Sequence, residues 1–291
     1  MGLSNGLIGA LRTGGWLTRA RVRLWGIAVL AAAAGGLGYL LATSDGLNDF
    51  QGRPLGTDFS NVYAAGTYVW EGHAEAAFDP VLQHARERTL FGEQTPFYGW
   101  HYPPFFLFVA AALACFPYLL ALAIWQGLTL LLYLAAIHAV LRAASRDAGE
   151  QPADDRLWLL LAIAFPAVFV NLGHGHNGFL TAALLSGALV VLDRRPLMAG
   201  MLFGLISYKP QFGLLIPLVL AASGRWRTIM AAAATVAALA LATTLAFGPD
   251  VWRAFLASTH FSRVVVLEPG DTGWHKLQSV FAWVRMWGGP V

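Results

Sequence analysis

The sequence predicts an all-α, polytopic membrane protein: a bundle of transmembrane helices with one long external loop that carries amphipathic surface helices. Of its 291 residues, 57% are hydrophobic and only 12% are charged, whereas a soluble domain carries about 25% charged residues. Several apolar stretches reach the length of about 20 residues that a helix needs to cross a bilayer. The small net charge of +3 is spread over short segments, which argues against a nucleic-acid-binding face. We expect a single membrane domain over 1–291.

The first span is predicted at residues 24–42. Residues 1–23 contain four arginines and no acidic residue, and the stretch 24–42 is uncharged. By the positive-inside rule, the N-terminus 1–23 is cytoplasmic. A secretory signal peptide also places a basic region before an apolar one, but its apolar region is shorter. Because further apolar segments follow, we interpret 24–42 as an uncleaved helix.

Residues 43–101 form the only long polar stretch and are expected to be an external loop. They hold eight acidic residues against three arginines. Apolar residues recur at helical spacing from Phe59 to Trp70, which predicts an amphipathic helix on the membrane surface. Asp79 followed by Pro80 is a typical N-cap and first helical position, and it predicts a second short helix that ends near Phe91.

The predicted helical bundle, 103–248, can be divided into spans in two ways. Its apolar blocks are 103–141, 157–192, 196–223 and 228–248. In the first division, the first two blocks hold two spans each and the third holds one. In the second, 103–116 is a short re-entrant or tilted helix and the third block is a hairpin that turns at Lys209-Pro210. Each division gives seven spans before residue 248. We favour the second, because it places the arginines of 142–156, 193–195 and 224–227 in the cytoplasm.

The C-terminal part is expected to begin a further helix. Residues 249–275 contain charged and aromatic residues and are predicted to be a second external segment. Residues 276–291 start another apolar helix, and we expect the chain to be truncated there. The single cysteine, Cys115, lies in an apolar run, and we expect its role to be packing. One cysteine excludes a disulfide framework and a thiolate metal cluster.

Asp58 has two compatible interpretations. Aspartate is among the best N-cap residues, and the amphipathic helix starts directly after it. A carboxylate at the membrane surface can also act as a general base, because it can accept the proton of an attacking hydroxyl group.

Lys209 is the least expected charge in the bundle, since it is one of only two lysines and lies between two apolar segments. A lysine near the bilayer centre costs about 2.5–3.5 kcal/mol, so an intramembrane lysine is functional by default. The alternative is a lysine that snorkels from a turn to the interface. If the block is a hairpin, Lys209 lies near the external face, where its ammonium can bind a lipid phosphate.

A polar stretch, 171–178, interrupts an apolar block with two histidines, two asparagines and three glycines. A metal site is weakly supported, because two histidines without a nearby carboxylate fall short of a usual ligand set. We prefer a polar turn in which His176 and Asn177 line the same cavity as Lys209. A solvated loop tip is an equally acceptable interpretation.

Four further residues are candidates for substrate binding. His101 and Tyr102 lie where the external loop re-enters the membrane. Arg263 and Arg285 can pair with a phosphate or a carboxylate. Aromatic and basic residues at an interface also serve as simple anchors, and for the two arginines this alternative is stronger than it is for Lys209. The sequence contains no phosphate-binding glycine loop and no serine-nucleophile elbow.

Several short motifs, in order along nearly the whole chain, resemble glycosyltransferase family 87, whose members have the GT-C fold and use polyprenyl-phosphate-linked sugars. The motifs are Thr57-Asp58-Phe59, Tyr102-Pro103-Pro104, Asn177-Gly178, Lys209-Pro210, and Gln278-Ser279 before Arg285. The resemblance implies a membrane enzyme whose catalytic base is Asp58 and which needs no cofactor, no nucleotide and no obligatory metal. Members usually have a glutamine near the position of His176, and they continue for several helices beyond the position of Val291.

We therefore expect an inverting glycosyltransferase, of the hexosyl- or mannosyltransferase type, in a bacterial-type inner membrane. It would move mannose or another hexose or pentose from polyprenyl phosphate to an envelope glycan or lipid acceptor at the extracytoplasmic face. Asp58 would be the base, and Lys209 with an arginine would hold the departing phosphate. The alternatives are a lipid or solute transporter, for which we find no duplicated half, and an inactive remnant of the enzyme.

Overall fold

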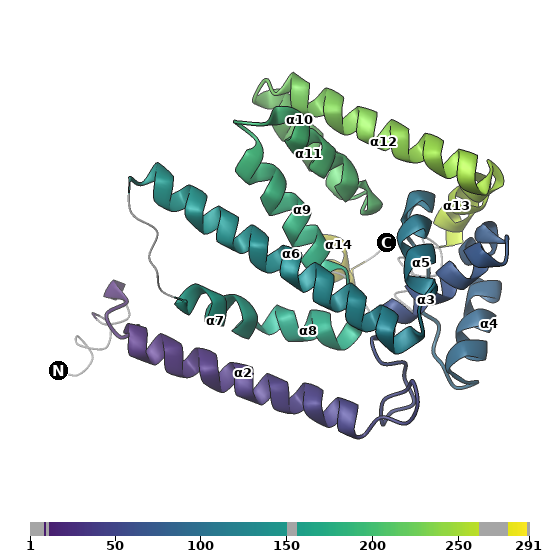
Figure 1. The fold of residues 1–291 in the computed structure, drawn as a ribbon, viewed down its shortest axis with the longest axis horizontal. Helices are drawn as coiled ribbons and strands as arrows, with labels where there is room; N and C mark the ends of the chain where they lie inside the picture. The colour runs from purple at the N-terminus through teal and green to yellow at the C-terminus, as the bar shows by residue number, and fades with distance from the viewer. Residues whose placement is uncertain (1–8, 10–11, 150–155, 262–278, 290–291) are drawn as a thin grey trace.

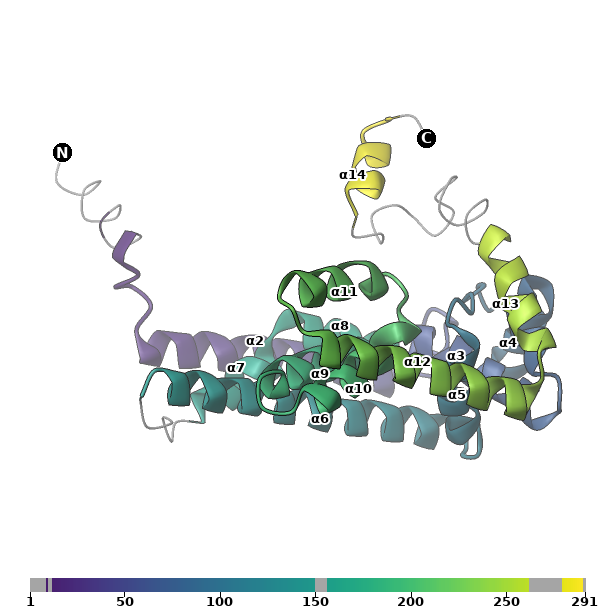
Figure 2. The same cartoon turned by 90° about the horizontal axis from the view of Figure 1, so that it is seen from above.

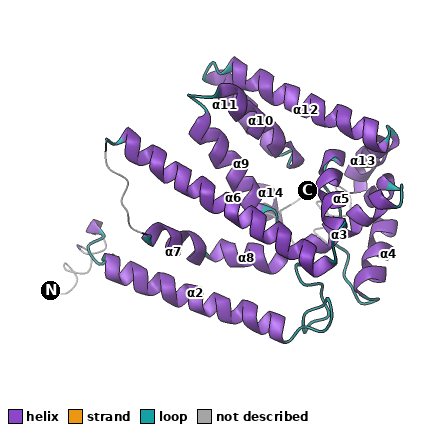
Figure 3. Cartoon of the chain, viewed as in Figure 1, coloured by secondary structure: helices purple, strands orange, loops and turns teal. Residues whose placement is uncertain are grey.

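The computed structural model describes residue 9 and residues 12–149, 156–261 and 279–289. Within these ranges the chain is all-α, and no strand is formed (Figure 3). The prediction of an all-α membrane protein is confirmed. The helices are α2 (Arg19–Ala42), α3 (Thr57–Trp70), η1 (Ala74–Phe78), α4 (Pro80–Phe91), η2 (Pro104–Phe106), α5 (Leu107–Ala114), α6 (Tyr118–Asp147), α7 (Leu157–Ala164), α8 (Pro166–His174), α9 (Gly178–Val191), α10 (Pro196–Leu205), η3 (Ile206–Tyr208), α11 (Phe212–Ala222), α12 (Trp226–Phe247), α13 (Asp250–Phe261) and α14 (Val280–Met286).

Three described helices, α2, α6 and α12, are long and apolar enough to cross a membrane. Helices α7 and α8 make a fourth span if taken together, although they bend by 51° at their junction. Proline at the first position of α8 explains this break, because it lacks the N–H that would continue α7. The seven spans predicted before residue 248 correspond to seven helical segments, but α9, α10 and α11 are shorter than a full span.

The helical segments form a flat layer with two distinct ends. Figure 2 shows α2, α6, α9, α10 and α12 in this layer, with α11 on one of its faces. In Figure 1, the start of α2, the end of α6 and the α9–α10 and α11–α12 connections lie at one end, and α3, α4, α5 and α13 lie at the other. The arginine-bearing connections therefore share one end, as the favoured division requires. The side of the membrane that each end faces stays a prediction.

The third apolar block is a helical hairpin. Helix α10 with η3 runs to Lys209, and α11 begins at Phe212. Two glycines of α10 let it pack tightly on α12: a Cβ on Gly200 would lie 2.4 Å from the carbonyl oxygen of Thr228, and one on Gly204 would lie 2.6 Å from Cβ of Thr235. This Gly-x-x-x-Gly spacing allows membrane helices to approach closely.

The long loop folds into a small helical unit around α3. The apolar face of α3, which includes the buried Phe59 and Val62, packs against α5, η1 and α4. A Cβ on Gly66 would lie 2.2 Å from the carbonyl oxygen of Ala110, so α3 and α5 are in backbone contact. The expected amphipathic helix is present, but other helices cover most of the face that we predicted to lie on the membrane.

Two local predictions concern this region. Helix α4 begins after Asp79, whose Oδ1 accepts hydrogen bonds from the backbone N–H groups of Val81 and Leu82 at 2.8 and 3.1 Å, and it ends at Phe91 as predicted. Cys115, for which we expected a packing role, is exposed just after α5. A short α5 places the end of the apolar run at the surface.

Candidate active site

Asp58 lies in the first turn of α3 and does not cap it. The N-cap position is taken by Gly56, which has a positive φ of 70°. No hydrogen bond reaches the Asp58 carboxylate from the described residues, and its side chain is 41% exposed. The capping hypothesis is therefore wrong. The carboxylate sits at the positive end of the α3 dipole, where its ionised form is favoured, and it is available to a substrate.

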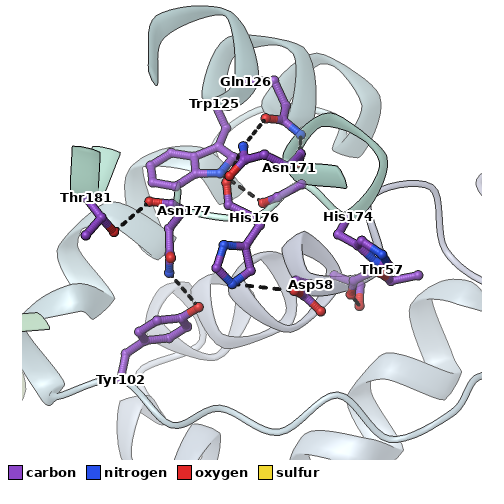
Figure 4. Close-up of polar contacts among 12 residues, drawn as sticks. Thr57, Asp58, Tyr102, Trp125, Gln126, Asn171, His174, His176, Asn177 and Thr181 are labelled. Atoms are coloured by element: carbon purple, nitrogen blue, oxygen red, sulfur yellow. Dashed lines mark hydrogen bonds and ion pairs between the residues drawn. The ribbon is translucent and has the colours of Figure 1, made fainter. Parts of the chain in front are cut away.

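The turn after α8 packs directly on this end of α3. Gly175 ends α8 with a φ of 64°, and a Cβ on it would lie 2.6 Å from Cβ of Phe59. As a result, Nε2 of His176 lies 3.8 Å from Oδ2 of Asp58 (Figure 4). Beside this pair, Oγ1 of Thr57 and Nδ1 of His174 are hydrogen-bonded at 2.7 Å. Both histidines of the polar stretch thus face the start of α3.

Two side chains of α6 hold the turn from behind. Nε1 of Trp125 donates to the carbonyl oxygen of Gly175 at 3.1 Å. Nε2 of Gln126 donates to the carbonyl oxygens of Asn171 and Leu172 at 3.0 and 2.9 Å. The amide of Asn171 in turn donates to the carbonyl oxygen of His176 at 2.9 Å. We did not predict Trp125 or Gln126 from the sequence, although a glutamine inside a long apolar helix is a recognisable signal.

A hydrogen-bond network joins this turn to the neighbourhood of Lys209. Nδ2 of Asn177 donates to the hydroxyl of Tyr102 at 2.7 Å. The hydroxyl of Tyr208 lies 2.7 Å from Oγ1 of Thr181 and donates to the carbonyl oxygen of Asn177 at 3.3 Å. Because Tyr208 directly precedes Lys209, the network links the loop end, the His176 turn and the α10–α11 hairpin. Tyr208 and Thr181 were also not predicted from the sequence.

The charges of the site act on one another. Burial lowers the pKa of His176, the positive charge of Lys209 lowers it further, and the negative charge of Asp58 opposes both effects. Burial also lowers the pKa of Lys209, and Asp58 again opposes the shift. Both residues lie in turns outside the helices. The neutral imidazole is therefore favoured at His176, and the contact with Asp58 is longer than a hydrogen bond.

Comparison with known families identifies the protein's class. The sequence profile of glycosyltransferase family 87 matches residues 100–291, about two thirds of the chain. The chain belongs to glycosyltransferase family 87. Searches among curated proteins and among solved structures found no match. With its apolar helices, the protein is a membrane glycosyltransferase, and the resemblance seen in the motifs is confirmed. The matched region includes Tyr102, His176, Asn177 and Lys209 but begins after Asp58.

The glycosyltransferase brings most of its predicted site residues together. Asp58, Tyr102, His176 and Asn177 come together from three segments through the contacts described above, and Lys209 interacts electrostatically with Asp58 and His176. His101 is exposed beside Tyr102 at the end of the loop.

Of the two predicted arginines, only Arg285 is described, and it does not lie with these residues. Arg285 lies on α14, which stands away from the helical layer in Figure 2, and its Nη1 donates to the carbonyl oxygen of Gly289 at 2.9 Å. Arg263 lies outside the described residues. Among the described residues, no group of three or more His, Cys, Asp or Glu side chains is placed to hold a metal ion.

Proposed function

We propose that this family 87 glycosyltransferase transfers a sugar from polyprenyl phosphate to a hydroxyl group of an envelope glycan or glycolipid, with inversion, at the extracytoplasmic face of the inner membrane. The observation that carries the proposal is that Asp58, a carboxylate that does not cap its helix, and the half-buried Lys209 lie close enough for the charge of one to act on the other. A base for the acceptor and a cation for the donor phosphate are the two groups that such a transfer requires.

The chemistry follows from these two roles. Asp58 accepts the proton of the acceptor hydroxyl while the hydroxyl oxygen attacks the anomeric carbon. The bond between that carbon and the phosphate oxygen breaks, and the sugar configuration inverts because a single displacement takes place. Lys209 stabilises the negative charge that develops on the departing polyprenyl phosphate. The turn position of Lys209 suits a donor whose head is polar and whose chain stays in the membrane.

His176 and Tyr102 orient the acceptor in this proposal. A neutral imidazole 3.8 Å from the Asp58 carboxylate can donate or accept a hydrogen bond without neutralising the base. The hydroxyl of Tyr102 accepts from Asn177, so its own proton is available to a sugar oxygen. Tyr102, the third residue of the matched region, thus contributes to acceptor binding in this proposal.

The donor class is tested by comparing two donors in membranes that carry the protein. One donor is polyprenyl phosphate carrying radiolabelled mannose, with other hexoses and arabinose in parallel, and the other is the matching set of nucleotide sugars. We expect transfer from a lipid-linked sugar only, and we expect a chelator to leave it unchanged. Direct use of a nucleotide sugar, after lipid-linked intermediates are excluded, would contradict the proposal.

A further inference from the structure

A small hollow lies in the external unit next to the site. Its volume is about 10 Å³, which is room for one water-sized group. Helix α4, η1, α13 and the segment 97–101 enclose it, and its lining includes Gln83, Phe97, Trp100, His101 and Ser258. Since His101 is exposed, the hollow lies close to the protein surface.

Two of the lining side chains carry buried polar atoms that have no hydrogen-bond partner among the described residues. Oε1 of Gln83 and Nε1 of Trp100 are unpaired, and the residues are 1% and 3% exposed. The amide nitrogen of Gln83 is used, because it donates to the carbonyl oxygen of Asn61 at 3.0 Å. A buried polar atom without a partner costs about 1–3 kcal/mol, so such a pair on one hollow needs an explanation.

A hydroxyl group within reach of both atoms would satisfy them. One of the two is an acceptor and the other is a donor, and a hydroxyl can donate to the first and accept from the second. Phe97 and Phe261 supply an apolar wall, with ring centroids 6.3 Å apart. Aromatic walls with a few placed polar groups are typical of sites for small polar ligands.

Side-chain contacts link the lining of the hollow to the candidate active site. The ring of Trp100 lies 5.0 Å from that of Tyr102, in an edge-to-face arrangement. Tyr102 in turn is hydrogen-bonded to Asn177, which follows His176. We propose that the hollow binds a non-reacting hydroxyl of the acceptor sugar, held between Gln83 and Trp100. This inference rests on the proposed function, since it takes the ligand to be the acceptor.

The test measures sugar binding without any donor. The purified protein, in lipid nanodiscs, is titrated with methyl glycosides of mannose, glucose, galactose and arabinose, and binding is followed by saturation-transfer NMR. Trp100→Phe keeps an aromatic ring and removes the N–H. We expect this variant to bind the preferred glycoside about tenfold more weakly, the loss typical of one buried hydrogen bond. The control is Trp70→Phe, because Nε1 of Trp70 already donates to the carbonyl oxygen of Ala111.

Deoxy analogues of the preferred glycoside provide a second measurement that needs no variant. One analogue should bind the parent protein about tenfold more weakly than the full sugar. In Trp100→Phe the difference between this analogue and the full sugar should be smaller, because only the hydrogen bond to Gln83 remains to be lost. Binding of none of the four glycosides, equal binding by the parent and Trp100→Phe, or equal binding of all deoxy analogues would overturn the proposal and leave a hollow that holds only water. Because the readout is binding, these outcomes are distinct from a failure of the catalytic role of Asp58.

Discussion

Glu87 of α4 is a buried acid that pairs with no cation in the part of the chain that the structure describes. Its side chain is fully buried, and Oε2 accepts a hydrogen bond from the backbone N–H of Tyr98 at 3.0 Å. Burial raises the pKa of Glu87 to about 8, so the folded protein holds this carboxyl group protonated at neutral pH. The unfolded chain releases the proton near pH 4.5.

This shift predicts a pH-dependent stability. Because the folded pKa is the higher one, the contribution of Glu87 is complete below about pH 4.5 and is lost as the pH rises toward 8, by up to about 1.4 kcal/mol per pH unit. Glu87→Gln should remove this part of the dependence. The measurement is thermal or urea unfolding in detergent between these pH values. The control is Glu93→Gln, since Glu93 is exposed and paired with Arg88. Parallel curves for the parent and Glu87→Gln would contradict the assignment.

Lys209 is predicted to act on the donor. Lys209→Met keeps the length of the side chain and removes the charge, so the donor KM should rise by roughly tenfold to a hundredfold, which is the range for a charge-assisted hydrogen bond. Lys209→Arg should restore part of the affinity, because the charge returns. The measurement is the donor dependence of transfer in membranes. If Lys209→Met left the donor KM and the turnover unchanged, the donor role would be wrong, and Lys209 would be a turn residue that snorkels to the interface.

Single residues show what the sequence could and could not predict. Lys209 stood out because a charge in an apolar block is costly, and the Asp79 cap was readable because capping is local. The cap at Gly56 was missed, because an aspartate two positions later is the better capping residue by preference. Thr57 and Tyr208 were also missed as site residues. Their partners are 117 and 27 residues away, so no local pattern identifies them.

At the scale of elements, the contact between the α8–α9 turn and the start of α3 sets the distance from Asp58 to His176. Gly175→Ala should weaken this contact, because the positive φ costs an L-residue about 1–2 kcal/mol and the new Cβ would collide with Phe59. We expect a lower unfolding free energy in detergent and a larger loss of transfer than stability explains.

Gly173→Ala is the control for this substitution. Gly173 lies in α8, and a Cβ there would meet no atom within 4 Å. Alanine in a helix should leave stability unchanged or raise it by about 0.5–1 kcal/mol. Equal effects of the two substitutions would show that the turn does not position the site.

Some of the breaks between helices could be predicted from the sequence and one could not. The hairpin at Lys209-Pro210 and the short helix after Pro104 were predicted, because proline and polar residues interrupt apolar runs there. The bend between α7 and α8 was not predicted, although Pro166 is visible in the sequence. A single proline is compatible with a kinked span or with two helices, and only packing against α2 and α6 decides between them.

For the whole molecule, the shared end of the arginine-bearing connections predicts a defined orientation. In a Cys115→Ala background, Glu150→Cys and Arg194→Cys should react with an impermeant maleimide only after the cells are opened, because 142–156 and 193–195 are predicted to be cytoplasmic. Gln94→Cys, in the predicted external loop, should be labelled in intact cells. Labelling of both Glu150→Cys and Arg194→Cys in intact cells would show that the orientation is the opposite of the predicted one.

The central claim is that Asp58 acts as a general base and that the surrounding helices and turns position it for this role. The direct measurement is transfer of radiolabelled sugar from polyprenyl phosphate by membranes that carry Asp58→Asn, with the unfolding midpoint of the same protein as the control for folding. Asparagine keeps the size of the side chain but cannot accept the proton. The account predicts a parent-like unfolding midpoint and a loss of at least about a hundredfold in transfer. An Asp58→Asn enzyme as active as the parent would contradict it.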